Sequence, residues 1–202
     1  MSYVLNEESF LKDVADHQMV VIKNDGVNRH IRFKRPDTLC MHFDLVTWPG
    51  VLCYTGDMGT FVFSRLEDMF QFFRRSDDSY RIDKRYWAEK LLAADRDGFE
   101  KYSPDLFRAR INDWLQDCDI DDETRDRIED EVLSEADDND YVAYRAAMEF
   151  NAGTDDEPRY IFQDFFEVST KEYTHRFTWC CYALAWGIQQ YDMHMAEQAV
   201  SA

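Results

Sequence analysis

The sequence contains no apolar run approaching the roughly 18 residues that a membrane-spanning helix requires. Its first residues also lack the basic and apolar segments of a secretory signal. There is no CxxC pair, and an odd number of cysteines, five, does not suit a framework of disulfides. We therefore expect a soluble, unexported, cytoplasmic protein with reduced thiols.

Motifs of common enzymes and metal sites are missing as well, including GxSxG, GxGxxG and HExxH. Residues 117–121 (DCDID) open like a calcium-binding loop, but Asp122 stands where a glycine is needed and Ile128 where a glutamate is needed.

Residues 56–59 (GDMG) lack the Lys-Ser/Thr of a P-loop and precede a strand pattern, which favours a hairpin turn. Cys180-Cys181 lies within an apolar helix pattern, which is typical of core packing. We predict neither a metal nor a cofactor.

Acidic residues, in contrast, are abundant and concentrated in one part of the chain. The net charge is -18; residues 1–100 carry 17 acidic and 14 basic side chains, net -3, and residues 101–202 carry 24 and 9, net -15. A stretch of 28 residues holds fourteen acidic side chains against Arg125 and Arg127 alone. The fourteen are Asp113, Asp117, Asp119, Asp121, Asp122, Glu123, Asp126, Glu129, Asp130, Glu131, Glu135, Asp137, Asp138 and Asp140.

A surface with this charge repels nucleic acid and anionic membranes, and it attracts basic proteins that bind DNA or RNA. Apolar residues persist through the stretch, so we expect it to fold. A helix rises 1.5 Å per residue and duplex DNA carries one charge per about 1.7 Å, so helices rich in Asp and Glu approximate the charge density of DNA. We predict that the fourteen residues bind a basic nucleic-acid-binding protein or ribonucleoprotein complex by imitating phosphates.

The first 75 residues have the pattern of a short helix, over about residues 6–17, followed by an antiparallel sheet. Asp25-Gly26 and Pro49-Gly50, with the turn at 56–59, separate segments rich in β-forming residues, which predicts a meander of about five strands. Ser64 then stands three residues before a glutamate, the spacing of a capping box, and an apolar face over residues 66–73 predicts a helix that covers the sheet.

The remaining chain has mainly helical patterns, over residues 84–94, 104–116, 122–136, 141–151 and 174–198. The last is the longest, and we expect it to form the buried centre of a second lobe. The polar stretch 74–79 marks the boundary. The fold class is therefore α+β, with an α+β lobe over 1–75 and an acidic helical lobe over 76–202; a single compact domain stays open as an alternative.

The N-terminal sheet holds the candidates for two alternative functions. His42 and Asp44 are two residues apart, which places them on one face of a strand, and with Asp57 they could bind or process a nucleotide or signalling molecule. A basic cluster, Arg29, Arg32, Lys34 and Arg35, could contact nucleic acid or the chain's own acidic half. A platform for base stacking could come from Phe33, Phe43, Trp48, Tyr54, Phe61 and Phe63.

Two segments carry a resemblance: residues 43–50 (FDLVTWPG) and 54–65 (YTGDMGTFVFSR), followed by the helix at 66–73. Here the sequence resembles a family of uncharacterised proteins encoded by tailed phages and prophages, over about its first 75 residues. The family has no known active site, so no catalytic residue is transferred. The resemblance implies the cytoplasm of a bacterial host and action on host machinery, in the manner of anti-CRISPR and anti-restriction proteins.

Together these observations predict a phage-encoded, stoichiometric inhibitor of a host defence complex, of the CRISPR-Cas or restriction type, and not an enzyme. Its acidic residues would block a basic groove. A phage accessory protein without mimicry is a further alternative, and the oligomeric state is open.

Overall fold

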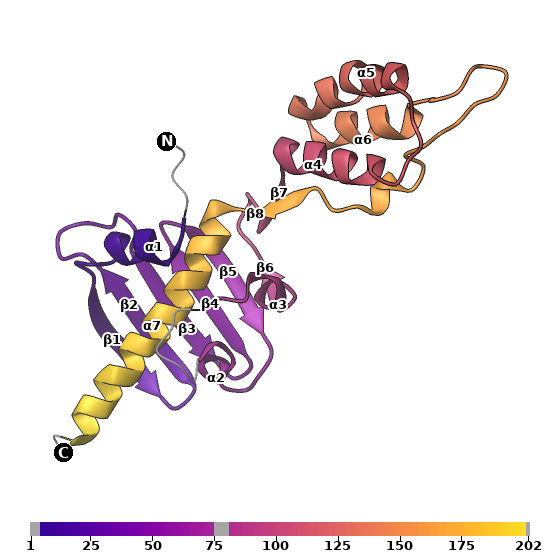
Figure 1. Ribbon diagram of the computed structural model, residues 1–202. Helices are drawn as coiled ribbons and strands as arrows, with labels where there is room; N and C mark the ends of the chain where they lie inside the picture. The colour runs from indigo at the N-terminus through magenta and orange to yellow at the C-terminus, as the bar shows by residue number, and fades with distance from the viewer. Residues whose placement is uncertain (1–4, 75–80, 201–202) are drawn as a thin grey trace. The chain divides into compact units, whose positions relative to one another are not determined.

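The computed structural model describes residues 5–74 and 81–200 and has an α+β fold (Figure 1). The chain divides into two compact units. The sheet unit comprises residues 1–99 together with 173–202, and the helical unit comprises residues 100–172. Across the described residues, no helix has both the length and the apolar character needed to span a membrane.

The sheet unit is built on a meander of six antiparallel strands that are neighbours in chain order. The five predicted strands are confirmed, and the glycines of their turns, Gly26, Gly50 and Gly59, have the positive φ values that favour glycine. The strands are β1 (Gln18–Asp25), β2 (Asn28–Lys34), β3 (Phe43–Trp48), β4 (Val51–Gly56), β5 (Gly59–Ser64) and β6 (Leu91–Ala93).

In the described part of the sheet unit, the helices that accompany the sheet are α1 (Glu7–Asp13), α2 (Met69–Phe73), α3 (Lys84–Ala88) and α7 (His175–Val200). Asn6 and Ser9 cap α1 reciprocally. The predicted cap at Ser64 is wrong, because Ser64 ends β5 and Asp68 caps α2 instead. The prediction of one helix over 84–94 is also wrong: α3 ends at Ala88, and β6 pairs with β5.

Helix α7 lies across the sheet, on the same side as α1 and α2 (Figure 1). It was predicted to form the centre of the acidic lobe, and this is wrong, because Phe177, Leu184 and Ile188 pack into the core of the sheet unit. The alternative of an exposed platform for base stacking on the sheet is not supported, because most of its aromatic side chains belong to the same hydrophobic core. Five of its aromatic residues are fully buried in that core, and only Trp48 is exposed.

The helical unit has its own hydrophobic core, formed by residues such as Phe107, Ile111, Ile128 and Phe165. The predicted helices at 104–116, 122–136 and 141–151 are present with shorter bounds, and Ser103, Asp121 and Asn139 cap them. The elements are β7 (Glu100–Tyr102), α4 (Pro104–Leu115), α5 (Asp122–Glu131), the 3-10 helices η1 (Leu133–Asp137) and η2 (Phe165–Glu167), α6 (Asp140–Glu149) and β8 (Lys171–Tyr173), where β7 pairs with β8.

The division between the units differs from the predicted boundary at residues 75 and 76. The sheet unit continues to Phe99 and includes the C-terminal helix, so the helical unit is an insertion between β6 and α7. Apart from Arg74, the polar stretch at 74–79 lies outside the described residues. The charge follows the observed division: the helical unit has 23 acidic and 8 basic side chains, net -15, which leaves -3 for the sheet unit.

Candidate functional site

All fourteen predicted site residues lie in the helical unit, on or between α4, α5, η1 and α6. Thirteen are exposed and Glu135 is partly buried. The apolar residues interleaved with them, Ile128, Val132 and Ala136 among others, point into the core. The acidic stretch is therefore a folded surface, and we call these fourteen residues the acidic surface.

The density of carboxylates is highest along α5. At about 100° per residue, five side chains fall within a sector of about 120° on the side away from the buried Ile128. We call these five the α5 stripe: Asp122, Glu123, Asp126, Glu129 and Asp130. They span eight residue steps, about 12 Å of helix, which gives a mean spacing of about 3.0 Å between successive carboxylates.

Few of these carboxylates have a cationic partner. Among the described residues, ion pairs reach three members of the acidic surface, joining Arg110 to Asp113 at 3.4 Å, Arg127 to Glu131 at 2.9 Å and Arg108 to Asp137 at 2.6 Å. The hydrogen bond from Arg108 holds the pKa of Asp137 below its usual value. The α5 stripe has no ion pair within the described part of the chain, and its five side chains are exposed to solvent.

Asp121 has a separate, structural role at the start of α5. Its Oδ1 accepts a hydrogen bond of 2.8 Å from the backbone N–H of Thr124, which caps the helix. Hydrogen bonds from Thr124 hold the pKa of Asp121 below its usual value. Substitution of Asp121 would therefore disturb α5 as well as remove a charge, and charge tests are better placed on the α5 stripe.

The candidates on the sheet do not form the predicted pair. His42 lies before β3, and its Nδ1 is 2.6 Å from the carbonyl of Leu39. Asp57 accepts a hydrogen bond of 2.9 Å from the backbone N–H of Met41. The hydrogen bonds of the Asp44 side chain are to side chains of β2. The prediction that His42 and Asp44 act together is not supported by this geometry.

Asp44 instead binds two residues that the sequence did not single out with it. Its Oδ2 lies 2.6 Å from His30 Nε2, and Arg32 donates two hydrogen bonds of 2.8 Å to its two oxygens. Arg32 is directly opposite Asp44 in the β2–β3 register. Burial opposes ionisation of Asp44, but these hydrogen bonds outweigh it and hold its pKa below the usual value. The sequence pattern of one strand shows which of its side chains share a face. Finding the cluster of Asp44, Arg32 and His30 also requires the register in which β2 pairs with β3.

Substitution of Asp44 by asparagine should lower the free energy of unfolding by about 1–3 kcal/mol at pH 7, because Arg32 and His30 lose their carboxylate partner. Since the pKa of Asp44 is lowered, its contribution is present above the pKa of an unfolded aspartate, about 3.9, and is lost as the pH falls through the folded value. Urea unfolding of both proteins at several pH values measures this. A difference that does not shrink toward pH 3 would contradict it.

The predicted basic cluster is divided by strand alternation, and two of its four cations are paired with carboxylates of the sheet unit. Arg29 faces the helices, where it donates to both oxygens of Asp68. Arg32, on the other face, is bound to Asp44. Lys34 and Arg35 donate to the backbone carbonyls of Pro36 and Asp13, respectively. Arg29 and Arg32 are therefore engaged within the sheet unit and are not free for the predicted contacts.

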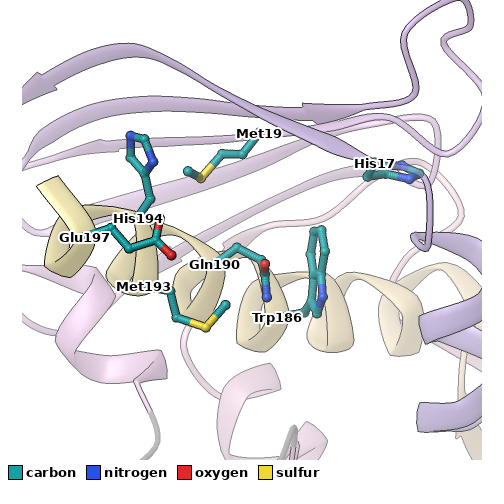
Figure 2. Close-up of a pocket in the computed structure, with 7 residues that line it drawn as sticks. All are labelled: His17, Met19, Trp186, Gln190, Met193, His194 and Glu197. Carbon is teal, nitrogen blue, oxygen red and sulfur yellow. The ribbon is translucent and has the colours of Figure 1, made fainter.

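A pocket of about 190 Å³ lies between the start of β1 and the C-terminal half of α7 (Figure 2). His17 and His194 are at opposite ends of the labelled row of residues, so the two imidazoles do not converge on one point. His17 Nε2 is 2.9 Å from the carbonyl of Met41, and burial lowers the His17 pKa. Throughout residues 5–74 and 81–200, no three His, Cys, Asp or Glu side chains are placed to hold a metal ion.

The cysteines are all in described positions, and all five are free. Cys180 and Cys181 are buried in the core of the sheet unit, where burial raises the pKa of both thiols. These two residues are therefore core residues, as predicted, and are poorly suited to nucleophilic chemistry.

No family model matches the chain, and neither a curated protein nor a solved structure matches it. The function is therefore inferred from the chain's own residues.

Proposed function

We propose that this protein is a stoichiometric inhibitor whose acidic surface occupies the basic nucleic-acid groove of a host defence complex. The observation that carries this proposal is the α5 stripe, five exposed carboxylates on one side of a helix, without ion pairs in the described part of the chain. We further propose a bacterial defence complex, of the CRISPR-Cas or restriction type, as the target; this part rests on the resemblance to phage proteins that we expect for the first 75 residues.

The charge spacing suits a groove that binds nucleic acid. One carboxylate per about 3.0 Å along α5 lies between a single DNA strand, with one charge per about 3.4 Å, and the duplex, with one per about 1.7 Å, and is closer to the single strand. Arginines and lysines arranged to contact phosphates would therefore find carboxylates at similar intervals. The same charge would repel nucleic acid itself, so the partner is a protein.

The folded state of the helical unit adds to this fit. Its core residues and helix caps hold the carboxylates in place before binding, so little conformational entropy is lost when the partner binds. A disordered acidic tail of equal charge would have to lose that entropy on binding. Preorganisation therefore favours a tight complex over a loose electrostatic one.

The alternative of a nucleotide-processing site on the sheet has less support. Asp44 is held by Arg32 and His30, and His42 is directed to the Leu39 carbonyl. Neither side chain is placed to act with the other on a substrate. We therefore propose binding without catalysis.

The test begins with capture of partners from a nuclease-treated bacterial lysate, using the full chain as bait. We expect a nucleic-acid-binding complex that duplex DNA or guide RNA displaces competitively. The bait is then compared with a variant of the α5 stripe, Asp122→Asn, Asp126→Asn, Glu129→Gln and Asp130→Asn. Loss of four exposed charges at about 0.5 kcal/mol each should weaken binding about 30-fold, and the wild type should lose more affinity than the variant as salt rises.

A matched control changes four other exposed acidic residues of the helical unit, as Asp155→Asn, Asp156→Asn, Glu157→Gln and Asp164→Asn. It has the same net charge as the α5 variant but leaves α5 intact, so it should bind nearly as well as the wild type. Equal losses in both variants would show an effect of net charge alone. Full affinity of the α5 variant would contradict the proposal.

A further inference from the structure

A hollow of about 260 Å³ lies along one side of α6, inside the most acidic part of the molecule. Its lining residues recur at three- and four-residue intervals and therefore share one side of the helix. They are Tyr141, Tyr144, Arg145, Met148 and Glu149. The volume is below that of pockets for drug-sized ligands, about 300–1,000 Å³, and is sufficient for one large side chain.

One residue of the lining, Tyr144, is held by contacts with the core, whereas two others are exposed. The Tyr144 hydroxyl donates a hydrogen bond of 2.6 Å to the carbonyl of Val168, and the Tyr144 ring packs against Phe107 and Phe165 of the core. Tyr141 and Met148, in contrast, are 69% and 40% exposed. The held ring of Tyr144 beside the flexible thioether of Met148 is suited to contact an apolar side chain of a partner.

The charged residues near the hollow indicate which residue types would flank the apolar side chain in the partner. Asp138 and Asp140 precede and begin α6 and have no ion pair among the described residues, whereas Asp137 is paired with Arg108; Glu149 lies at the other end of α6. Arg145, the cation of the hollow's lining, is close to the Tyr141 ring, at 5.8 Å from its centre, and 3.9 Å from the Glu149 carboxylate. An apolar site framed by carboxylates complements an apolar side chain that is flanked by Arg or Lys.

We infer that the α6 hollow is the anchor point of the partner interface, and that it receives an aromatic side chain from a basic segment of the partner protein. This inference rests on the proposed function, and it adds a specific contact that the charge alone does not supply. Charge directs the approach of the partner, and burial of an aromatic side chain slows its dissociation.

Synthetic peptides provide a defined probe. One has a tryptophan flanked by three arginines on each side, and its partner has alanine in place of the tryptophan. Titration of the full chain should show about tenfold tighter binding of the tryptophan peptide. Tyr141→Ala/Met148→Ala should abolish this preference, whereas Tyr160→Ala, at a tyrosine of the same unit that is 46% exposed, should retain it. Equal affinity of the wild type for both peptides would overturn the inference.

The captured complex separates this inference from the proposed function. Tyr141→Ala/Met148→Ala should weaken its binding about tenfold with an unchanged salt dependence, because an apolar contact is not screened. The substituted side chains are exposed, and melting temperature verifies that both variants fold. If this variant binds normally while the α5 variant is impaired, the anchor is wrong and the acidic inhibitor stands. If the α5 variant binds normally, the proposed function fails.

Discussion

Replacement of Gly187 by leucine is expected to lower the free energy of unfolding by about 3 kcal/mol or more, which approaches the whole stability of many small domains. At Gly187, helix α7 packs closely against side chains of the sheet. A Cβ built there would lie 3.1 Å from a ring carbon of Phe33, and 3.2 Å from atoms of Leu45 and Phe43. All three neighbours are fully buried.

These neighbours have little room to move. The rings of Phe33 and Phe43 are stacked with their centres 4.7 Å apart, and Trp186 contacts both edge-on. A leucine would therefore force α7 away from the sheet and expose the aromatic core. Urea unfolding monitored by tryptophan fluorescence and circular dichroism would measure the loss.

Gln189→Leu is the matched control, because it places the same side chain two residues away, at a partly exposed position of α7. It should change stability by less than about 0.5 kcal/mol. If Gly187→Leu were as stable as this control, the close packing of α7 on the sheet would be wrong.

Substitution of Asp68 by alanine should cost about 3 kcal/mol, the second large effect. Asp68 accepts hydrogen bonds of 2.8 and 3.0 Å from Arg29, and it also caps α2 through the backbone N–H of Phe70 at 3.0 Å. The Arg29 side chain is only 9% exposed and lies over the Phe70 ring. Without Asp68, a buried guanidinium would lose its counter-charge, and α2 would lose its cap.

This loss should depend on pH. Burial opposes ionisation of Asp68, but the hydrogen bonds from Arg29 and Phe70 outweigh it and lower its pKa. The stabilisation is therefore present above about pH 3.9, the pKa of an unfolded aspartate, and disappears as the pH falls through the folded pKa. Unfolding at pH 7 and pH 3 would show a smaller difference between wild type and variant at pH 3 than at pH 7.

The exposed pair of Arg74 and Asp192 offers a comparison, since its side chains are 38% and 35% exposed. Asp192→Ala should cost no more than about 1 kcal/mol, because water replaces the lost partner. Equal costs at Asp68 and Asp192 would mean that burial does not strengthen the Arg29 pair, contrary to the expectation here.

Local signals predicted much of the secondary structure. Asp25-Gly26 marks a hairpin because its turn needs positive φ, and Pro104 after Ser103 marks the start of α4. The segment at 84–94 was predicted incorrectly, because Leu91-Leu92-Ala93 suits a helix or a strand equally. The segment forms a strand because it pairs with β5, whose paired residues lie about thirty positions earlier in the chain.

The sequence by itself determined that the chain is α+β, that its charge is concentrated near α5, and that residues 174–198 form a long apolar helix. These properties follow from composition and from spacing along one segment. Only the tertiary structure decided that α7 covers the sheet, that Asp44 pairs with Arg32 and not His42, and that the acidic helices form an inserted unit. Each depends on which segments distant in sequence bury each other's apolar surface or pair their strands, and no local pattern records that choice.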